Sequence, residues 1–229
     1  MPFPFKFEDP EKKKYFAKST YPDKDNIEPR EVLRENPLKI NISEKYKTLY
    51  FNIPKCGSTT LMRKLESRQN NNYYTEDLSK YQDYKKLVVL RDPMSRVLSM
   101  YNNIAINTAW FKDCVNKPYY IHRNNFDESF QYFLDELKVT KCNGHFIPQY
   151  RYIEDKNVAI EDFDYIILFK NLQKDIKKIY NFSTLNDALY HNYNKKRDIS
   201  KFREQVYEIY KTDFELYDYV KKNKLCYSQ

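Results

Sequence analysis

The stretch Leu49-Tyr-Phe-Asn-Ile53, continued by Pro54-Lys-Cys-Gly-Ser-Thr-Thr60, is the part of this sequence that decides its fold. The first five residues are mostly apolar and predict a short buried strand. Apolar residues in 61–65 follow at helical spacing and predict a helix, with a turn over 54–58 between the two elements. A strand, a loop and a helix in this order form one unit of an α/β domain with a parallel sheet.

The loop of this unit has the composition of a phosphate-binding loop. It carries one lysine, one glycine and three consecutive hydroxyl residues at the point where a helix begins. Amide groups at a helix N-terminus favour an anion, and a glycine lets the backbone approach a ligand closely. The alternative is an ordinary helix start, where Ser and Thr are common caps. The residues expected to bind phosphate are Pro54, Lys55, Cys56, Gly57, Ser58, Thr59 and Thr60.

A second unit of the same kind follows. Leu87–Leu90 predicts a short apolar strand, and Asp92 with Pro93 predicts the N-cap and first residue of a helix. Arg91 leaves the strand at its carboxyl end, where open α/β sheets bind ligands. The helix is expected to turn Val97, Tyr101 and Ile104 to the core, and Arg96, Ser99 and Asn103 to a different face.

Arg91 and Ser99 together suit a second phosphate, because a guanidinium with a nearby hydroxyl can clamp such a group. The alternative for Arg91 is a simple pair with Asp92 at the helix start. Further along, the pattern predicts a helix at 126–137, a strand at Tyr165–Phe169, a helix capped by Asn171, and two final helices near 202–210 and 214–220.

The fold class expected is therefore α/β, with a P-loop-like three-layer arrangement of a central parallel sheet between helices. Six of the ten prolines lie in the first 37 residues, which predicts an irregular N-terminal arm over 1–45 and one domain over 46–229.

Composition narrows the possible functions. The chain has two glycines in 229 residues, so neither the dinucleotide fingerprint nor the two-glycine Walker loop can be present. A net charge of +8 makes an anionic partner plausible. The four cysteines lack metal-ligand spacing, so no metal is expected. No stretch has the ~18 apolar residues of a membrane span and the N-terminus lacks a signal-peptide pattern, so we expect a soluble, cytoplasmic protein.

The two loop segments together resemble the signature sites of sulfotransferases that use 3′-phosphoadenylyl sulfate (PAPS). Lys55-Cys-Gly-Ser-Thr-Thr60 resembles the loop for the 5′-phosphosulfate, and Arg91-Asp-Pro with Arg96 and Ser99-Met-Tyr resembles the segment for the 3′-phosphate. The similarity extends over roughly 48–219 and is strongest to the carbohydrate sulfotransferases of the chondroitin and dermatan type. The further runs that carry it are 126–134, 145–149, 163–166 and 210–217.

Two departures from those carbohydrate enzymes concern the acceptor side. Phe146 stands where the family usually has Trp, and the run Tyr152-Ile-Glu-Asp-Lys156 stands where it usually has a cysteine pair. The membrane anchor of the Golgi members has no counterpart in this sequence.

The resemblance implies a role for each segment. PAPS would be the co-substrate, and its sulfuryl group would pass to an acceptor hydroxyl, with a carbohydrate as the expected acceptor. Lys55 would neutralise charge on the leaving phosphate, and the amides and hydroxyls of Gly57–Thr60 would hold the 5′-phosphate. Arg91, Arg96 and Ser99 would hold the 3′-phosphate. Arg197 would reach the 3′-phosphate or the acceptor, or else belong to a solvated run of charges.

Transfer to the acceptor requires a base that takes up the proton of the acceptor hydroxyl. His145 is the first candidate, because histidine titrates near neutral pH and this one lies in a run that matches a family motif. Acceptor positioning and a purely structural role remain as alternatives for it. Glu66, on the first helix, is the second candidate base.

Two other functions stay open at the level of sequence. One is a non-catalytic polyanion-binding protein that uses the net positive charge. The other is a small-molecule kinase on a P-loop fold, which the order of the loop disfavours because its lysine precedes the glycine. No nucleic-acid partner is expected.

Overall fold

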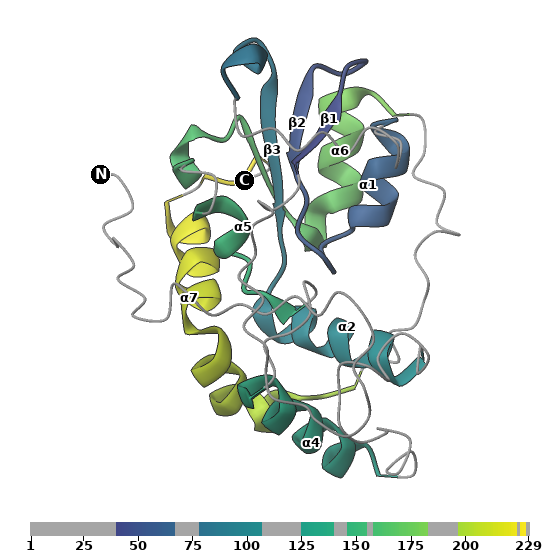
Figure 1. The fold of residues 1–229 in the computed structure, drawn as a ribbon, viewed down its shortest axis with the longest axis vertical. Helices are drawn as coiled ribbons and strands as arrows, with labels where there is room; N and C mark the ends of the chain where they lie inside the picture. The colour runs from purple at the N-terminus through teal and green to yellow at the C-terminus, as the bar shows by residue number, and fades with distance from the viewer. Residues whose placement is uncertain are drawn as a thin grey trace, which may run out of the picture.

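The computed structural model describes residues 40–66, 78–106, 125–139, 146–154, 158–182, 197–223 and 225–227. Its centre is one four-stranded sheet in the order β1-β2-β3-β4 (Figure 1). The outer strand β1 is antiparallel to β2, and the other neighbours are parallel. The strands are β1 (Ile40–Ser43), β2 (Thr48–Phe51), β3 (Lys85–Leu90) and β4 (Tyr165–Leu168).

The parallel register brings three strand ends to one edge of the sheet. Phe51, the last residue of β2, pairs with Val88, and Leu90, the last residue of β3, pairs with Leu168 at the end of β4. The loops that leave these three strands therefore begin close together, and the candidate site is built there.

Helices lie on both sides of the sheet (Figure 1). The figure shows α1 and α6 on one side and α5 with the C-terminal part of the chain's last helix, α7, on the other, while α2, α4 and the first part of α7 lie beyond the carboxyl edge. The α-helices are α1 (Ser58–Lys64), α2 (Pro93–Ile106), α4 (Phe126–Val139), α5 (Arg151–Glu154), α6 (Leu172–Tyr180) and α7 (Arg203–Lys222). Short 3₁₀ turns are η2 (Leu78–Tyr81), η5 (Ile160–Asp162), η6 (Phe169–Asn171) and η8 (Ser200–Phe202).

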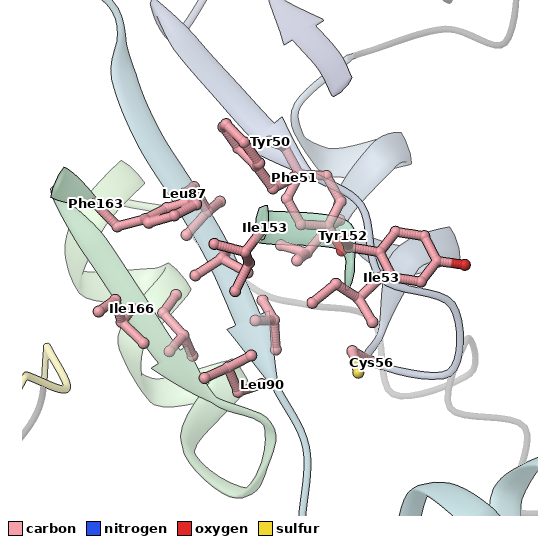
Figure 2. Packing of buried hydrophobic residues seen from close by; sticks show 14 of the residues in the cluster. Tyr50, Phe51, Ile53, Cys56, Leu87, Leu90, Tyr152, Ile153, Phe163 and Ile166 are labelled. Carbon is pink, nitrogen blue, oxygen red and sulfur yellow. The ribbon is translucent and has the colours of Figure 1, made fainter. Parts of the chain in front are cut away.

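Two hydrophobic clusters stabilise the described part of the chain. The larger one surrounds the sheet and reaches from Phe163 and Ile166 through Leu90 to Cys56 at the carboxyl edge (Figure 2). The second lies between α2, α4 and α7 and is rich in aromatic rings, among them Tyr101 and Phe130. The long helix α7 contributes to both clusters and so joins the sheet to the helices beyond its edge.

The expected α/β fold is confirmed, with small differences at the ends of elements. The predicted cap of α2 is present, since the Ser95 amide donates to Asp92 Oδ1 at 2.9 Å. Asn171 stands at the N-cap position of α6, but its side chain makes no capping hydrogen bond. The structure has one helix α7 where the sequence predicted two, and a non-helical residue, Tyr210, marks the kink between its halves.

Two expectations need correction. Residues 40–43 form strand β1, although they belong to the segment 1–45 that was predicted to be irregular; residues 1–39 lie outside the described residues. Arg96 was expected to hold the 3′-phosphate from a face of α2 different from that of Val97 and Tyr101, and it is buried, with 1% of its surface exposed. Its burial is possible because an acidic side chain and two carbonyl oxygens meet its guanidinium.

Candidate active site

The loops after β2, β3 and β4 are in contact at the carboxyl edge of the sheet. Arg91, directly after β3, donates from Nη1 to the carbonyl oxygen of Lys55 at 2.8 Å. Its guanidinium carbon also lies 4.3 Å from the centroid of the Phe169 ring, at the end of β4. The structure thus brings together the two segments that the sequence assigned to two phosphate groups.

The loop after β2 is tightly curled. Lys55 and Gly57 both have left-handed backbone angles, with φ of 69° and 86°. The Cys56 amide and the Ser58 hydroxyl both donate to the Ile53 carbonyl oxygen, at 3.2 and 2.8 Å. A left-handed lysine is a strained conformation that the surrounding contacts must hold, as is common at functional loops. The Ser58 hydroxyl, expected to bind phosphate, serves in this structure to close the loop.

The structure shows a packing reason for a glycine at position 57. A Cβ atom at this position would lie 2.6 Å from Leu172 Cδ2 and 3.3 Å from Phe169 Cε2. The side of Gly57 on which a Cβ atom would stand therefore faces the start of α6. Any side chain here would collide with the core, in addition to the strain of the positive φ.

The other predicted members of the loop differ in exposure. Thr60 is buried within α1, whereas Thr59 is exposed beside it. Pro54 contributes its carbonyl oxygen to Arg96 Nε at 3.2 Å. Cys56 is fully buried, and burial raises the pKa of its thiol to about 11. The protonated thiol donates to Gln149 Oε1 at 3.3 Å, so its side chain is a packing and hydrogen-bonding element and not a nucleophile.

Lys55 is the titratable group most altered by this environment. Burial lowers its pKa to about 8, and the nearby positive charges of Arg91 and Arg96 act in the same direction. The ammonium group is still charged at neutral pH, but its charged form is destabilised because it is partly dehydrated and lies beside two guanidinium groups. An anionic ligand at this point would relieve that cost.

Arg96 connects the site internally. Its Nη2 donates to the Ile147 carbonyl oxygen at 2.8 Å, and its Nη1 lies 3.5 Å from Asp213 Oδ2 on α7. Together with the bond to Pro54, these contacts occupy atoms on three sides of the guanidinium. Arg96 therefore holds the loop after β2, the segment 146–150 and α7 together.

Two polar residues that the sequence analysis gave no role complete this network. Gln149 accepts from the Arg91 amide through Oε1 and donates from Nε2 to the Arg91 carbonyl, both at 2.9 Å. Asp213 accepts from the amides of Gln149 and Tyr150, at 2.9 and 3.1 Å. Burial raises the pKa of the Asp213 carboxyl, while Arg96 and the two N–H groups oppose that rise and favour the carboxylate.

A signal for Asp213 is present in the sequence. The buried face of α7 carries Val206, Tyr210, Asp213, Tyr217 and Val220, spaced four, three, four and three residues apart. A single carboxylate on an otherwise apolar stripe indicates a buried partner of opposite charge. Gln149 has no comparable periodic signal, because it follows Pro148 in a short irregular segment; its signal is its place in the run 145–149 that carries the resemblance.

The remaining candidates lie on other elements or outside the described residues. Ser99 lies half-buried on α2, one turn beyond Arg96. Arg197 is exposed, and its guanidinium carbon is 4.3 Å from the centroid of the Phe126 ring on α4. Glu66 follows the C-terminal end of α1, opposite the end that forms the loop, and is ion-paired with Lys45. His145 lies outside the described residues.

The described residues contain no group of three or more His, Cys, Asp or Glu side chains that could hold a metal ion. None of the helices described combines the length and apolar composition that a membrane span requires.

Comparison with known proteins gives one result. A family model with the description "Sulfotransferase family" matches residues 38–220, which is most of the chain. The same comparison found no curated protein and no solved structure that matches this chain. The matched region begins just before β1 and ends within α7, so it contains every segment of the network described above.

Proposed function

The chain belongs to the sulfotransferase family, whose members transfer a sulfuryl group from PAPS to a hydroxyl-bearing acceptor, and we propose that the acceptor of this protein is a carbohydrate. The family match shows the reaction type. The carbohydrate is supported by the similarity of residues 126–134, 145–149, 163–166 and 210–217 to the chondroitin and dermatan type of enzyme.

The observation that carries the proposed donor site is the hydrogen bond between Arg91 Nη1 and the Lys55 carbonyl oxygen. It joins the two segments that resemble the 5′ and 3′ phosphate sites of the family. The side chains present fit a doubly phosphorylated nucleotide, because two cationic groups and the first amides of α1 lie at one edge of the sheet. In this proposal Lys55 and the backbone of Gly57–Thr60 bind the 5′ end, while Arg91 and Ser99 bind the 3′-phosphate.

Sulfuryl transfer makes three physical demands on such a site. The acceptor oxygen forms a bond to sulfur as the bond from sulfur to the phosphate oxygen breaks, so the acceptor and donor must be held in line. The leaving phosphate gains negative charge, which the Lys55 ammonium is suited to stabilise. The acceptor hydroxyl loses its proton to a base.

His145 remains the proposed base. It immediately precedes Phe146, whose carbonyl oxygen accepts from Tyr210 Oη at 2.8 Å within the network. Glu66 is ion-paired at the far end of α1 and does not enter the proposal. Arg197 is proposed to act on the acceptor side, from its position over Phe126.

Two measurements test this proposal. 3′-Phosphoadenosine 5′-phosphate (PAP) should raise the melting temperature at moderate salt, whereas ATP with magnesium should have little effect. Sulfate transfer from labelled PAPS, read by mass spectrometry, should modify desulfated chondroitin or dermatan. Transfer only to small phenols or amines would overturn the carbohydrate assignment. Equal shifts with PAP and ATP, or transfer of phosphate from ATP, would overturn the donor site.

The base is tested separately. His145→Ala should lower turnover by at least about a hundredfold while the affinity for PAP stays within a factor of two, because a base acts in the transition state. Glu66→Ala is the matched control and should leave both quantities unchanged. Normal turnover in His145→Ala would show that another group accepts the proton.

A further inference from the structure

We propose that Gln149 is a positioning residue that gives the site its selectivity for a 3′-phosphate, acting through Arg91. The inference rests on the proposed function, in which Arg91 binds that phosphate. Gln149 itself is 1% exposed and lies beneath the site, so it acts by placing Arg91 and not by touching the nucleotide.

Gln149 takes the place of a neighbouring strand. Arg91 is the first residue after β3, whose last residue, Leu90, pairs with Leu168. The side-chain amide of Gln149 accepts from the Arg91 N–H and donates to the Arg91 carbonyl, which is the pair of bonds that one residue makes in an antiparallel ladder. The backbone of Arg91 is therefore held as firmly as a strand residue, although the strand has ended.

The orientation of this amide is determined by its other partners. Oε1 receives a second hydrogen bond from the protonated Cys56 thiol, so the oxygen must face the two donors and the nitrogen must face the Arg91 carbonyl. The main chain of Gln149 is fixed in turn, because its amide donates to Asp213, which is also paired with Arg96. The side chain therefore has one available position.

With its backbone fixed, the Arg91 side chain is directed by three further contacts. Nη1 donates to Lys55, Nε donates to Ser95 Oγ at 3.2 Å, and the guanidinium lies over Phe169. Loss of the Gln149 amide would leave the Arg91 N–H and carbonyl without these partners and let the strand end move. The loop expected to bind the 5′-phosphate would lose only the bond from the Cys56 thiol, so we expect it to be affected less.

The selectivity is measured as the ratio of two dissociation constants, for AMP and for PAP, by isothermal titration calorimetry. AMP lacks the 3′-phosphate and reports general damage to the site. We expect Arg91→Ala to abolish most of the selectivity and Gln149→Leu to reduce it about tenfold, the size of one or two lost hydrogen bonds. Gln149→Glu serves as the second test if Gln149→Leu fails to fold. Its carboxylate keeps the acceptor for the Arg91 N–H but cannot donate to the Arg91 carbonyl, so it should also reduce the ratio. Gln131→Leu, at a half-buried position of α4 where the side chain donates to Asp135, is the matched control and should keep the wild-type ratio.

A double variant shows whether Gln149 acts through Arg91. In Gln149→Leu/Arg91→Ala the ratio should be that of Arg91→Ala alone, because the group that Gln149 positions is gone. A further fall in the double variant, or equal weakening of AMP and PAP in Gln149→Leu, would overturn the inference. If the wild-type protein does not distinguish PAP from AMP, or if Arg91→Ala keeps the full ratio, the proposed donor site itself is wrong.

Discussion

Two arginines of the segment expected to bind the 3′-phosphate make different contacts in this structure. Arg91 and Arg96 lie five residues apart and were both assigned to the 3′-phosphate. Both residues are buried, with 7% of Arg91 and 1% of Arg96 exposed, but the guanidinium of Arg96 is bonded to Pro54, Ile147 and Asp213, so Arg91 is the residue we propose for the phosphate. The charge of Arg96 still matters, because together with Arg91 it lowers the pKa of Lys55.

The lowered pKa of Lys55 predicts that donor binding depends on pH. The pKa of about 8 in the unliganded protein lies below the ordinary value of 10.5, and a bound phosphate favours the charged ammonium. Above pH 8 the lysine is neutral until the ligand arrives, so binding must take up a proton and the affinity for PAP should fall by up to about tenfold per pH unit.

Calorimetry in buffers of different ionisation enthalpy measures this proton uptake. Lys55→Arg is the matched control, because an arginine stays charged throughout this range, and its affinity should not fall between pH 8 and 9.5. The same fall in Lys55→Arg would mean that another group titrates.

The stability of the unliganded protein changes with pH in the opposite direction to the affinity for PAP. The cost of the buried Lys55 charge is present below pH 8, and it is relieved as the pH rises through the folded-state pKa of Lys55.

Pairs of elements determine the shape of the site. The loop before α1 packs directly on η6 and the start of α6, with Gly57 at the point of contact. On the opposite side, the kink of α7 at Tyr210 allows Tyr210 Oη to reach the Phe146 carbonyl while Asp213 reaches the amides of 149 and 150. The segment 146–150 is thereby held by side chains although it forms no strand.

The contact at Gly57 predicts a loss of stability on substitution. Gly57→Ala should lower the free energy of unfolding by about 2 to 4 kcal/mol, from the positive φ and from the clash with Leu172. Urea denaturation measures this change, and Thr59→Ala, at an exposed position of the same helix, should stay within about 0.5 kcal/mol. An unchanged stability combined with lost PAP affinity would show that the glycine serves the approach of a ligand instead.

Across the whole molecule, the buried pair of Arg96 and Asp213 joins the sheet edge to the helices beyond it. Arg96 belongs to α2 and Asp213 to α7, and both side chains are almost completely buried. Between them they contact the loop after β2 and the segment 146–150. The two hydrophobic clusters are thus connected by polar contacts as well as by the length of α7.

Removal of both members of this pair should cost less stability than the two single removals added together. Asp213→Ala leaves the Arg96 charge buried without its partner and should cost about 3 to 5 kcal/mol of unfolding free energy. Arg96→Met/Asp213→Leu removes both charges and should cost less than the sum of the losses measured for Arg96→Met and Asp213→Leu separately. Asp218→Ala breaks an exposed pair with Lys221 on the same helix and should cost less than about 1 kcal/mol. Additive losses in the double variant would show that the pair is not coupled.

The parts that could be predicted from sequence are those with strong local patterns. Buried parallel strands are short apolar runs, so β2, β3 and β4 were predicted within a few residues of their bounds. The strand β1 was missed, because four residues beside a proline-rich stretch carry little pattern and are stabilised by pairing with β2. The sequence predicted two helices, near 202–210 and 214–220, and the structure has a kink at Tyr210 within one helix instead.

The sequence by itself determined the α/β class, the two donor segments and the resemblance to sulfotransferases, because strand periodicity, loop composition and motif order are local properties of the chain. Only the tertiary structure decided which residues meet. Arg91 donates to the Lys55 carbonyl, and Gln149 makes two hydrogen bonds to the backbone of Arg91. Arg96 is buried against Asp213, and Gly57 faces Leu172. These contacts join residues far apart in the chain, and they depend on strand register and helix packing, which no local pattern encodes.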